Sequence, residues 1–362
     1  DGATVVSVCD CNLHVVGYST PVHARMGLGE LQQHLHSLPQ QPAAIPYRTS
    51  YYADGWGFCL TDDQRRALPE GEYEVLIDAD LAPGAVELGE VVIEGSGDRE
   101  VLLWTYCCHP SMANNELSGP VVAAHLAALL RERETPPRHT YRIVFGPETI
   151  GAIAYLARFG ERLSERLVAG YVMTCLGDPG PFTYKRSRRG DSLADRVAEH
   201  VLAHLDAPHG VLDFVPVGSD ERQFCSPGYD LPVGSLMRTM YGVYPEYHTS
   251  LDDLAFITPR ALGETLDAYV RIVDALEANE TLIGTVLYGE PQLGRRGLYP
   301  STGGPSAALS AGRQRDMMLL LNFCDGKRDL LAAAQAGGRP IAELARTAAL
   351  LREHGLLRPV ST

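Results

Sequence analysis

Lysine is nearly absent from this chain of 362 residues: Lys185 and Lys327 are the only two among its 31 basic residues. Acidic residues number 45, and the formal net charge is -14. Phosphate binding needs a basic face, so this charge disfavours nucleic acid as a main partner. No run of about eighteen apolar residues occurs, which excludes a membrane-spanning helix from the sequence. We therefore expect a small-molecule or peptide-like substrate as the partner.

Cysteine is also scarce. Eight cysteines are too few for a disulfide scaffold, and their spacing fits no zinc knuckle. Cys107 and Cys108 are neighbours in an apolar, strand-like run. We expect reduced, buried thiols and a cytoplasmic location. The chain begins at Asp1 in the middle of a pattern, so we also expect that an N-terminal segment precedes it.

The first hundred residues show short elements. Strand-like runs and a helix-like stretch to His36 predict that residues 1–40 begin an α/β core. Residues 41–97 are strand-rich, and Tyr73–Asp78 and Ala85–Ile93 alternate apolar with polar residues, as half-buried antiparallel strands do. This segment is predicted to be a β-rich insertion.

The pattern changes at Glu100. Three nearly continuous apolar strands alternate with helical patterns, which is typical of a mainly parallel sheet with helices on both faces. The strands are Val101–Tyr106, Tyr141–Phe145 and Val168–Cys175, and the helices lie at about 118–131, 150–159, 191–205 and 258–279. The α/β core is predicted over residues 98–285.

The C-terminal part is different again. Residues 286–310 are rich in Gly, Pro and Ser and are predicted to be a linker. Residues 311–362 carry three helical patterns, which predict a winged-helix-like domain. Because its charge is only mildly positive, this domain fits a docking or packing role better than DNA binding.

Polar clusters follow the predicted core strands. Functional residues of open parallel sheets gather where strands end. The clusters are Cys108–Gly119, Gly146–Gly151, Gly218–Gln223 and Pro245–Asp253. They bring a histidine, a carboxylate and a second histidine to strand ends, which predicts a zinc site built from separate loops.

Each candidate has a simpler explanation. His109 could bond a backbone carbonyl, and Glu148 or Asp220 could cap a helix. His248 could pack in an aromatic cluster with its neighbouring tyrosines. Their joint placement at the strand ends of one core nevertheless favours a metal site over four coincidences.

The chain resembles the aminopeptidase-like proteins with DUF4910 and DUF2172 domains, distant relatives of the M28 zinc exopeptidases. The likeness extends over nearly the whole chain. It is carried by Leu13–Ser19, Ile45–Tyr51, Trp56–Cys59, the His109 loop, Pro147–Gly151, Gly218–Gln223, Glu246–Ser250 and Asn322–Lys327. The resemblance implies a zinc-exopeptidase-like sheet, with His109 and His248 as metal-binding histidines and Glu148 as the general base.

The sequence departs from the family pattern at its acidic ligands. Asn115 stands at the position of the metal-bridging aspartate, and Thr149 at the position of a second glutamate. Thr174 or Cys175 stands where another aspartate is expected. An amide brings no charge, so a two-metal site is disfavoured. The model that remains is one zinc held by His109, His248 and a carboxylate, with Asp220 preferred over Glu221, Glu116 and Glu148.

Several residues are candidates for substrate binding. Arg222, Arg238 and the run Lys185–Arg189 could bind a carboxylate or phosphate, although a solvated basic loop explains Lys185–Arg189 equally well. We also assign Tyr247, Glu116 and Asn115 to the substrate side of the pocket.

Three functions stay open. The first is a zinc-dependent hydrolase of the aminopeptidase or amidase type that acts on a small amide or peptide-like substrate. The second is a mono-zinc cyclase, lyase or transferase acting on a natural-product intermediate, because glutaminyl cyclases use the same scaffold with one zinc. The third is a non-catalytic relic used for binding or assembly. Self-association is compatible with all three.

Overall fold

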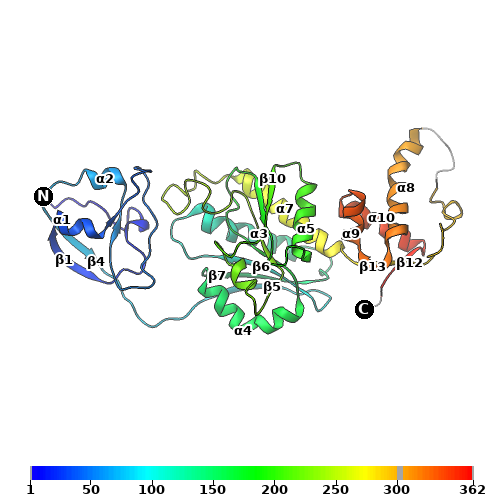
Figure 1. Ribbon diagram of the computed structural model, residues 1–362, viewed down its shortest axis with the longest axis horizontal. Helices are drawn as coiled ribbons and strands as arrows, with labels where there is room; N and C mark the ends of the chain where they lie inside the picture. The colour runs from blue at the N-terminus through cyan, green and yellow to red at the C-terminus, as the bar shows by residue number, and fades with distance from the viewer. Residues whose placement is uncertain (1, 300–304, 361–362) are drawn as a thin grey trace.

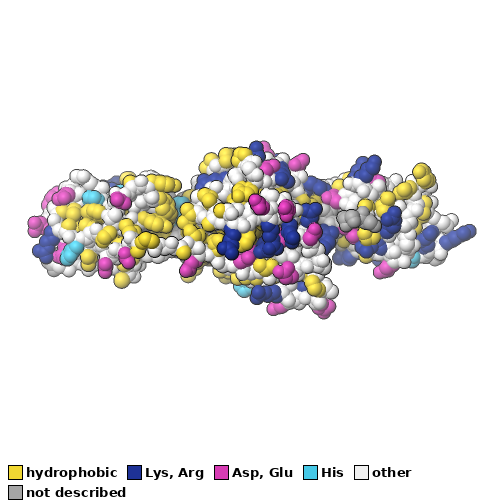
Figure 2. Space-filling model, turned by 90° about the horizontal axis from the view of Figure 1, so that it is seen from below, with side chains coloured by type: hydrophobic (Ala, Val, Ile, Leu, Met, Phe, Trp, Pro, Cys, Tyr) yellow, Lys and Arg dark blue, Asp and Glu magenta, His cyan; other side chains and the backbone are white. Residues whose placement is uncertain are grey.

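The computed structural model describes residues 2–299 and 305–360, with the side chains of 305–311 left aside. Three units follow one another along the long axis of the molecule (Figure 1). A small N-terminal unit lies at one end, the α/β core in the middle and a helical unit at the other end. Figure 2 shows basic side chains over the core on one face, interspersed with acidic ones, so this face does not form an unbroken basic surface.

The N-terminal unit is built on two short strand pairs. Strand β1 pairs antiparallel with β4, and β2 pairs parallel with β3. Its elements are η1 (Asn12–His14), β1 (Val22–Gly27), α1 (Leu28–Leu31), η2 (Gln32–His34), β2 (Leu35–His36), β3 (Phe58–Cys59), α2 (Asp62–Arg66) and β4 (Glu72–Ile77).

The prediction that residues 1–40 begin the α/β core is wrong. Met26 of β1 packs with Val75 and Ile77 of β4 in a hydrophobic cluster that belongs to the small unit. Both strands alternate exposed and buried residues, so each has one face in solvent. In the described part of the chain, neither strand pairs with any strand of the core sheet.

The core holds a seven-stranded sheet with the order β10-β9-β11-β8-β6-β7-β5. Four of its six pairings are parallel, and the pairs β11–β9 and β5–β7 are antiparallel. The strands are β5 (Gly89–Ile93), β6 (Glu100–Tyr106), β7 (Thr140–Gly146), β8 (Leu167–Val172), β9 (Phe182–Lys185), β10 (His209–Leu212) and β11 (Val233–Met237). Strand β5 lies in the range predicted for the insertion, but it forms the edge of the core sheet.

Helices cover both faces of this sheet, as the sequence predicts. Every residue of β6 is buried. Leu103 packs in the cluster that contains α3, α5 and α7, whereas the next residue, Trp104, packs in the cluster that contains α4 and α6. The core helices are the π-helical turn η3 (Ala113–Leu117), α3 (Ser118–Arg131), α4 (Ile150–Arg166), α5 (Leu193–Ala203), α6 (Glu221–Phe224) and α7 (Pro259–Ala278).

The C-terminal unit combines three helices with a three-stranded sheet of order β13-β12-β14. Its elements are β12 (Thr281–Gly284), η4 (Gly294–Arg296), α8 (Pro305–Phe323), β13 (Asp325–Asp329), α9 (Leu330–Gly337), α10 (Ile341–Glu353) and β14 (Leu357–Pro359). The middle strand β12 therefore comes from the range predicted for the core, and α8 begins inside the range predicted for the linker. Asp329 binds Arg196 of α5 through two hydrogen bonds, which ties this unit to the core.

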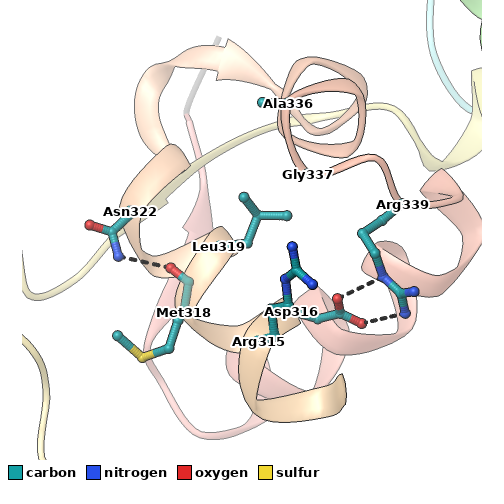
Figure 3. Close-up of a pocket in the computed structure, with 8 residues that line it drawn as sticks. All are labelled: Arg315, Asp316, Met318, Leu319, Asn322, Ala336, Gly337 and Arg339. Atoms are coloured by element: carbon teal, nitrogen blue, oxygen red, sulfur yellow. Dashed lines mark hydrogen bonds and ion pairs between the residues drawn. The ribbon is translucent and has the colours of Figure 1, made fainter. Parts of the chain in front are cut away.

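A cavity of about 360 Å³ lies in the C-terminal unit (Figure 3). The Arg339 guanidinium makes two hydrogen bonds with the Asp316 carboxylate at its wall. Leu319 points toward the turn of Ala336 and Gly337, where a Cβ on Gly337 would lie 2.2 Å from the Leu319 side chain. Its lining contains none of the candidate metal, catalytic or substrate-binding residues.

No helix among the described residues is long and apolar enough to cross a membrane. All eight cysteines are free. Cys107 and Cys108 are exposed, which corrects the expectation that all the thiols are buried. They follow the last residue of β6, at the edge where the covered sheet opens into loops.

The place of β12 can be tested by truncating one leucine. Leu282 in β12 is 1% exposed and lies between two partner strands. Leu282→Ala should lower the free energy of unfolding by about 2–5 kcal/mol, as for other buried leucines. The amides of β13 and β14 should also lose protection from hydrogen exchange. The matched change Leu287→Ala, at a leucine that is 59% exposed, should leave both measurements nearly unchanged. Equal effects of the two substitutions would contradict the assignment of β12 to the C-terminal unit.

Candidate active site

Three of the predicted side chains meet at the carboxyl edge of the core sheet. His109 follows β6, Glu148 follows β7, and His248 lies in the long loop after β11. The ring centroids of the two histidines are 4.8 Å apart. Nε2 of His109 lies 3.7 Å from Oε2 of Glu148. The structure thus brings together residues that are up to 139 positions apart in the chain.

Glu116 holds the other side of the His109 ring. Its Oε1 lies 2.5 Å from Nδ1 of His109, and its Oε2 accepts a hydrogen bond of 2.7 Å from the backbone N–H of Cys108. Burial by itself lowers the pKa of His109, but the hydrogen bond to Glu116 and the charges of Glu116 and Glu148 raise it above its usual value. Glu116 lies in the π-helical turn η3, an element that often occurs at functional sites.

The turn η3 is fixed by a carboxylate from the His248 loop. Asp252 accepts hydrogen bonds from the backbone N–H groups of Asn114 and Asn115, at 2.6 and 3.0 Å. The Asn115 side chain donates weakly to Tyr106, and its buried Oδ1 has no hydrogen-bond partner among the described residues. Asn115 is therefore at the site, but it contributes a neutral amide there.

Asp220 positions the loop that carries Glu148. Its two carboxylate oxygens accept hydrogen bonds from the Trp104 indole, at 2.7 Å, and from the backbone N–H of Thr149, at 2.8 Å. Thr149 has a φ of 62° and a ψ of -70°, a conformation that persists only when its surroundings enforce it. Burial is the main reason that the pKa of Glu148 and that of Asp220 rise to about 7.

His248 is held by aromatic packing. Its ring stacks on Tyr247 with centroids 3.9 Å apart, and Tyr247 meets Tyr244 edge to face. Burial and the nearby charge of His109 lower the pKa of His248 to about 3, so the ring is neutral at pH 7. Its Nε2 is buried and has no hydrogen-bond partner among the described residues. Tyr247 therefore supports the histidine, and its contact with substrate stays a prediction.

The N-terminal unit contributes a residue to this site. The Tyr47 ring lies 4.8 Å from that of His109 and 5.2 Å from that of His248, between centroids. Its backbone N–H donates to the carbonyl of His248, and Ile45 and Ser250 exchange two further hydrogen bonds. Residue-by-residue reasoning missed Tyr47. In the sequence, Tyr47 stood out only as part of Ile45–Tyr51, one of the segments that carry the family resemblance.

Two predicted basic contacts lie elsewhere. Arg238 donates to Glu264 of α7 and packs over the Phe182 ring, so its partner belongs to the protein. Lys185 is 1% exposed and donates to Glu221 and to Tyr241, which corrects the alternative of a solvated loop.

Unlike Arg238 and Lys185, Arg222 lies next to the site. Its guanidinium donates a hydrogen bond of 3.1 Å to the Thr149 hydroxyl, beside the Glu148 loop. Its buried Nε has no hydrogen-bond partner among the described residues. The structure therefore leaves Arg222 next to the site, where it can still contact a substrate.

One group of metal-ligand side chains is already assembled. Among the described residues, the single set of three whose ligand atoms all lie within 4.8 Å of one another is Cys108, His109 and Glu116. Nitrogen, sulfur and carboxylate donors together suit zinc. Asp220, predicted as a ligand, lies outside this set, and both of its oxygens accept hydrogen bonds from the protein. Cys108 was not predicted as a ligand, although it is adjacent to His109 in the sequence.

Comparison with known proteins agrees with this fold. The model of a domain of unknown function, DUF4910, matches residues 13–279, and a winged helix-turn-helix model matches residues 280–359. The chain belongs to the DUF4910 family. The resemblance seen in the sequence and the predicted C-terminal winged helix are both confirmed.

A curated protein and a crystal structure, both from Clostridium acetobutylicum, are similar to this chain over almost its whole length. A Clostridium acetobutylicum protein, named for polysaccharide biosynthesis and for an aminopeptidase-like domain, is 42% identical over 99% of this chain and 81% of its own length. A crystal structure of a candidate peptidase from the same organism superimposes with a TM-score of 0.91, at 40% identity, over 99% of this chain and 81% of that one.

More distant structures show the fold alone. BSAP, a zinc aminopeptidase from Bacillus subtilis, is 15% identical, with a TM-score of 0.51 over 67% of this chain and 63% of that one. The core of the DUF4910 domain therefore has the fold of the zinc aminopeptidases.

Asp220 provides a test of how the Glu148 loop is held. Asp220→Asn keeps the volume but turns an NH₂ group toward one of the two N–H donors, of Trp104 or Thr149. The free energy of unfolding should fall by about 1–3 kcal/mol, the effect of one unpaired buried donor. Denaturant unfolding measures this loss, and Asp54→Asn at an exposed position is the control. An equally stable Asp220→Asn protein would show that these two hydrogen bonds do not stabilise the loop.

Proposed function

We propose that this protein is a metal-dependent hydrolase that cleaves the amide bond of a small or peptide-like substrate. One observation carries the proposal: the ring of His109 has a carboxylate at each nitrogen, and a neutral His248 with a free Nε2 packs beside it. A neutral imidazole without a partner and a buried carboxylate are the groups that metal-assisted hydrolysis needs. The family's aminopeptidase-like relatives and their fold support the same reaction class.

One zinc-type ion would be held by His109 and Glu116, and His248 would have to move to join them, because it lies outside the group of donor atoms that are all within 4.8 Å of one another. Lys185 pairs with Oε1 of Glu221, and Asp220 accepts two hydrogen bonds, so both carboxylates already have protein partners, although the buried Oε2 of Glu221 has none among the described residues. A second ion lacks its bridging carboxylate, because Asn115 and Thr149 occupy those positions. When bound, such an ion would polarise the substrate carbonyl and make water more acidic.

Glu148 would act as the proton carrier. It would accept a proton from the attacking water and deliver it to the leaving amine. A pKa of about 7 suits both steps, because proton transfer is most effective when the pKa is close to the working pH. Asp220 and the strained Thr149 hold this carboxylate next to His109.

The shape of the site favours small substrates. Tyr47 from the N-terminal unit packs against both histidines, so one side of the site is closed by a second unit of the chain. Arg222 and Asn115 each have a buried polar atom without a partner among the described residues, and these atoms can bind substrate. The name of the Clostridium relative suggests an amide-bearing intermediate of polysaccharide synthesis as one substrate to test.

A second candidate follows from the loss of the bridging carboxylate. A single ion without Asn115 as a ligand also suits a cyclase, lyase or transferase. Product analysis separates these reactions from hydrolysis. Zinc content of protein purified without chelator separates both from a non-catalytic relic. Self-association and a cytoplasmic location remain predictions from the sequence.

Replacement of Glu148 tests its role as the base. Glu148→Gln keeps the volume but removes the proton acceptor, so turnover should fall by about a hundredfold or more. The bound zinc, measured by elemental analysis, should stay near the wild-type content. His248→Ala is the contrasting variant, and it should lose zinc together with activity. If Glu148→Gln loses zinc as well, Glu148 is a ligand. Full activity would exclude the proposed mechanism.

Removal of the Tyr47 ring tests the contribution of the N-terminal unit. Tyr47→Ala should lower kcat/KM on a panel of aminoacyl anilides by about tenfold, which corresponds to an aromatic contact of about 1.4 kcal/mol. Tyr52→Ala is the control, because Tyr52 is fully exposed on the same loop. Equal kcat/KM values for the two variants would show that the N-terminal unit does not form part of the site.

A further inference from the structure

We propose that Cys108 is a thiolate ligand of the metal ion that His109 and Glu116 hold. The proposal rests on the proposed function in one respect, that a metal binds at His109. It goes further by naming a sulfur donor in a site predicted to have only nitrogen and oxygen donors. The evidence is the geometry of the cluster, the charge of the site and the surroundings of the sulfur.

The geometry places the sulfur with the other donors. Sγ of Cys108 lies 3.0 Å from Nδ1 of His109 and 3.9 Å from Oε1 of Glu116. With zinc–nitrogen bonds of about 2.0–2.1 Å and zinc–sulfur bonds of about 2.3 Å, two donors of a tetrahedral site lie about 3.3–3.6 Å apart. The two sulfur distances lie on either side of this range. Binding of an ion would require the sulfur to move, and also Oε1 of Glu116, which lies only 2.5 Å from Nδ1 of His109.

The charge of the site leaves room for another anion. Neutral Asn115 and Thr149 stand at positions where the family pattern has carboxylates, and a divalent ion beside one carboxylate and two imidazoles would keep a positive charge. A thiolate from Cys108 together with Glu116 supplies two negative charges, which balance the ion. Zinc in catalytic sites can expand to five ligands, so the sulfur does not exclude a substrate oxygen.

The surroundings of the sulfur suit a ligand. The backbone N–H of Glu148 donates to Sγ of Cys108 over 3.4 Å, and such a bond stabilises negative sulfur. Cys107 is also exposed, but it is not in the donor group. It is therefore a matched control one residue away.

Cobalt(II) provides the test, because a thiolate ligand gives it a charge-transfer band in the near ultraviolet. The metal-free full-length protein is titrated with Co²⁺, and absorption spectra of the wild type, Cys107→Ser and Cys108→Ser are compared. The wild type and Cys107→Ser should show the band. Cys108→Ser should lose it, keep the visible ligand-field bands and bind Co²⁺ about tenfold or more weakly, the lower end of the losses seen when metal sites are altered. Denaturant unfolding of each metal-free variant shows whether it is folded.

The other outcomes separate this proposal from the proposed function. If the wild type binds Co²⁺ without a thiolate band, or if Cys108→Ser keeps the band, Cys108 is not a ligand, although a metal site still exists. If the folded wild type binds no Co²⁺, this proposal and the metal-dependent hydrolase both fail. If Cys107→Ser loses the band and Cys108→Ser keeps it, the sulfur donor is the neighbouring residue, and the assignment to Cys108 is overturned.

Discussion

Burial of the central sheet on both faces determines where this protein can carry out chemistry. Strand β6 has no exposed residue, and successive side chains such as Leu103 and Trp104 enter hydrophobic clusters on opposite faces. A polar side chain along such a strand needs a buried partner, as Glu100 has in Arg142, because an unpaired polar group there would lose its hydration. Polar side chains that are free to bind a ligand can begin only beyond its carboxyl end. His109 stands there, and Glu148 occupies the same place after β7.

The loops at this edge are held by buried hydrogen bonds. Asp220 links Trp104 of the sheet to the backbone of Thr149, and Asp252 links the His248 loop to the turn η3. Positive φ angles at non-glycine residues gather in the same loops, at Ser111, Thr149, Cys175 and His248. Such conformations persist only where the surrounding structure enforces them, and they cluster at functional sites. Rigid loops keep donor atoms in place before a ligand arrives.

The core does not assemble this site alone. Tyr47 comes from a different unit and closes the space beside both histidines, so access depends on the contact between the units.

Lys185 and Glu221 form a buried ion pair in the core, in which Glu221 is also bonded to Tyr241. A buried pair of this kind is strongly destabilised when one partner is lost. Oε1 of Glu221 therefore serves the structure, whereas its buried Oε2 has no hydrogen-bond partner among the described residues.

The sequence by itself indicated the class of the core, because continuous apolar strands followed by polar loops are typical of a covered sheet with a functional edge. Its short motifs identified the family, and that resemblance singled out His109, Glu148 and His248. Only the tertiary structure decided the unit boundaries. Strands β1, β5 and β12 are too short and too ambiguous to reveal their partners, since pairing depends on contacts far away in the chain. Only the tertiary structure also decided the contacts of Asp220, Arg238, Tyr47 and Cys108. Their roles depend on which atoms lie within about 3–4 Å, the range of hydrogen bonds and ligand contacts, and spacing along a sequence carries no information about that.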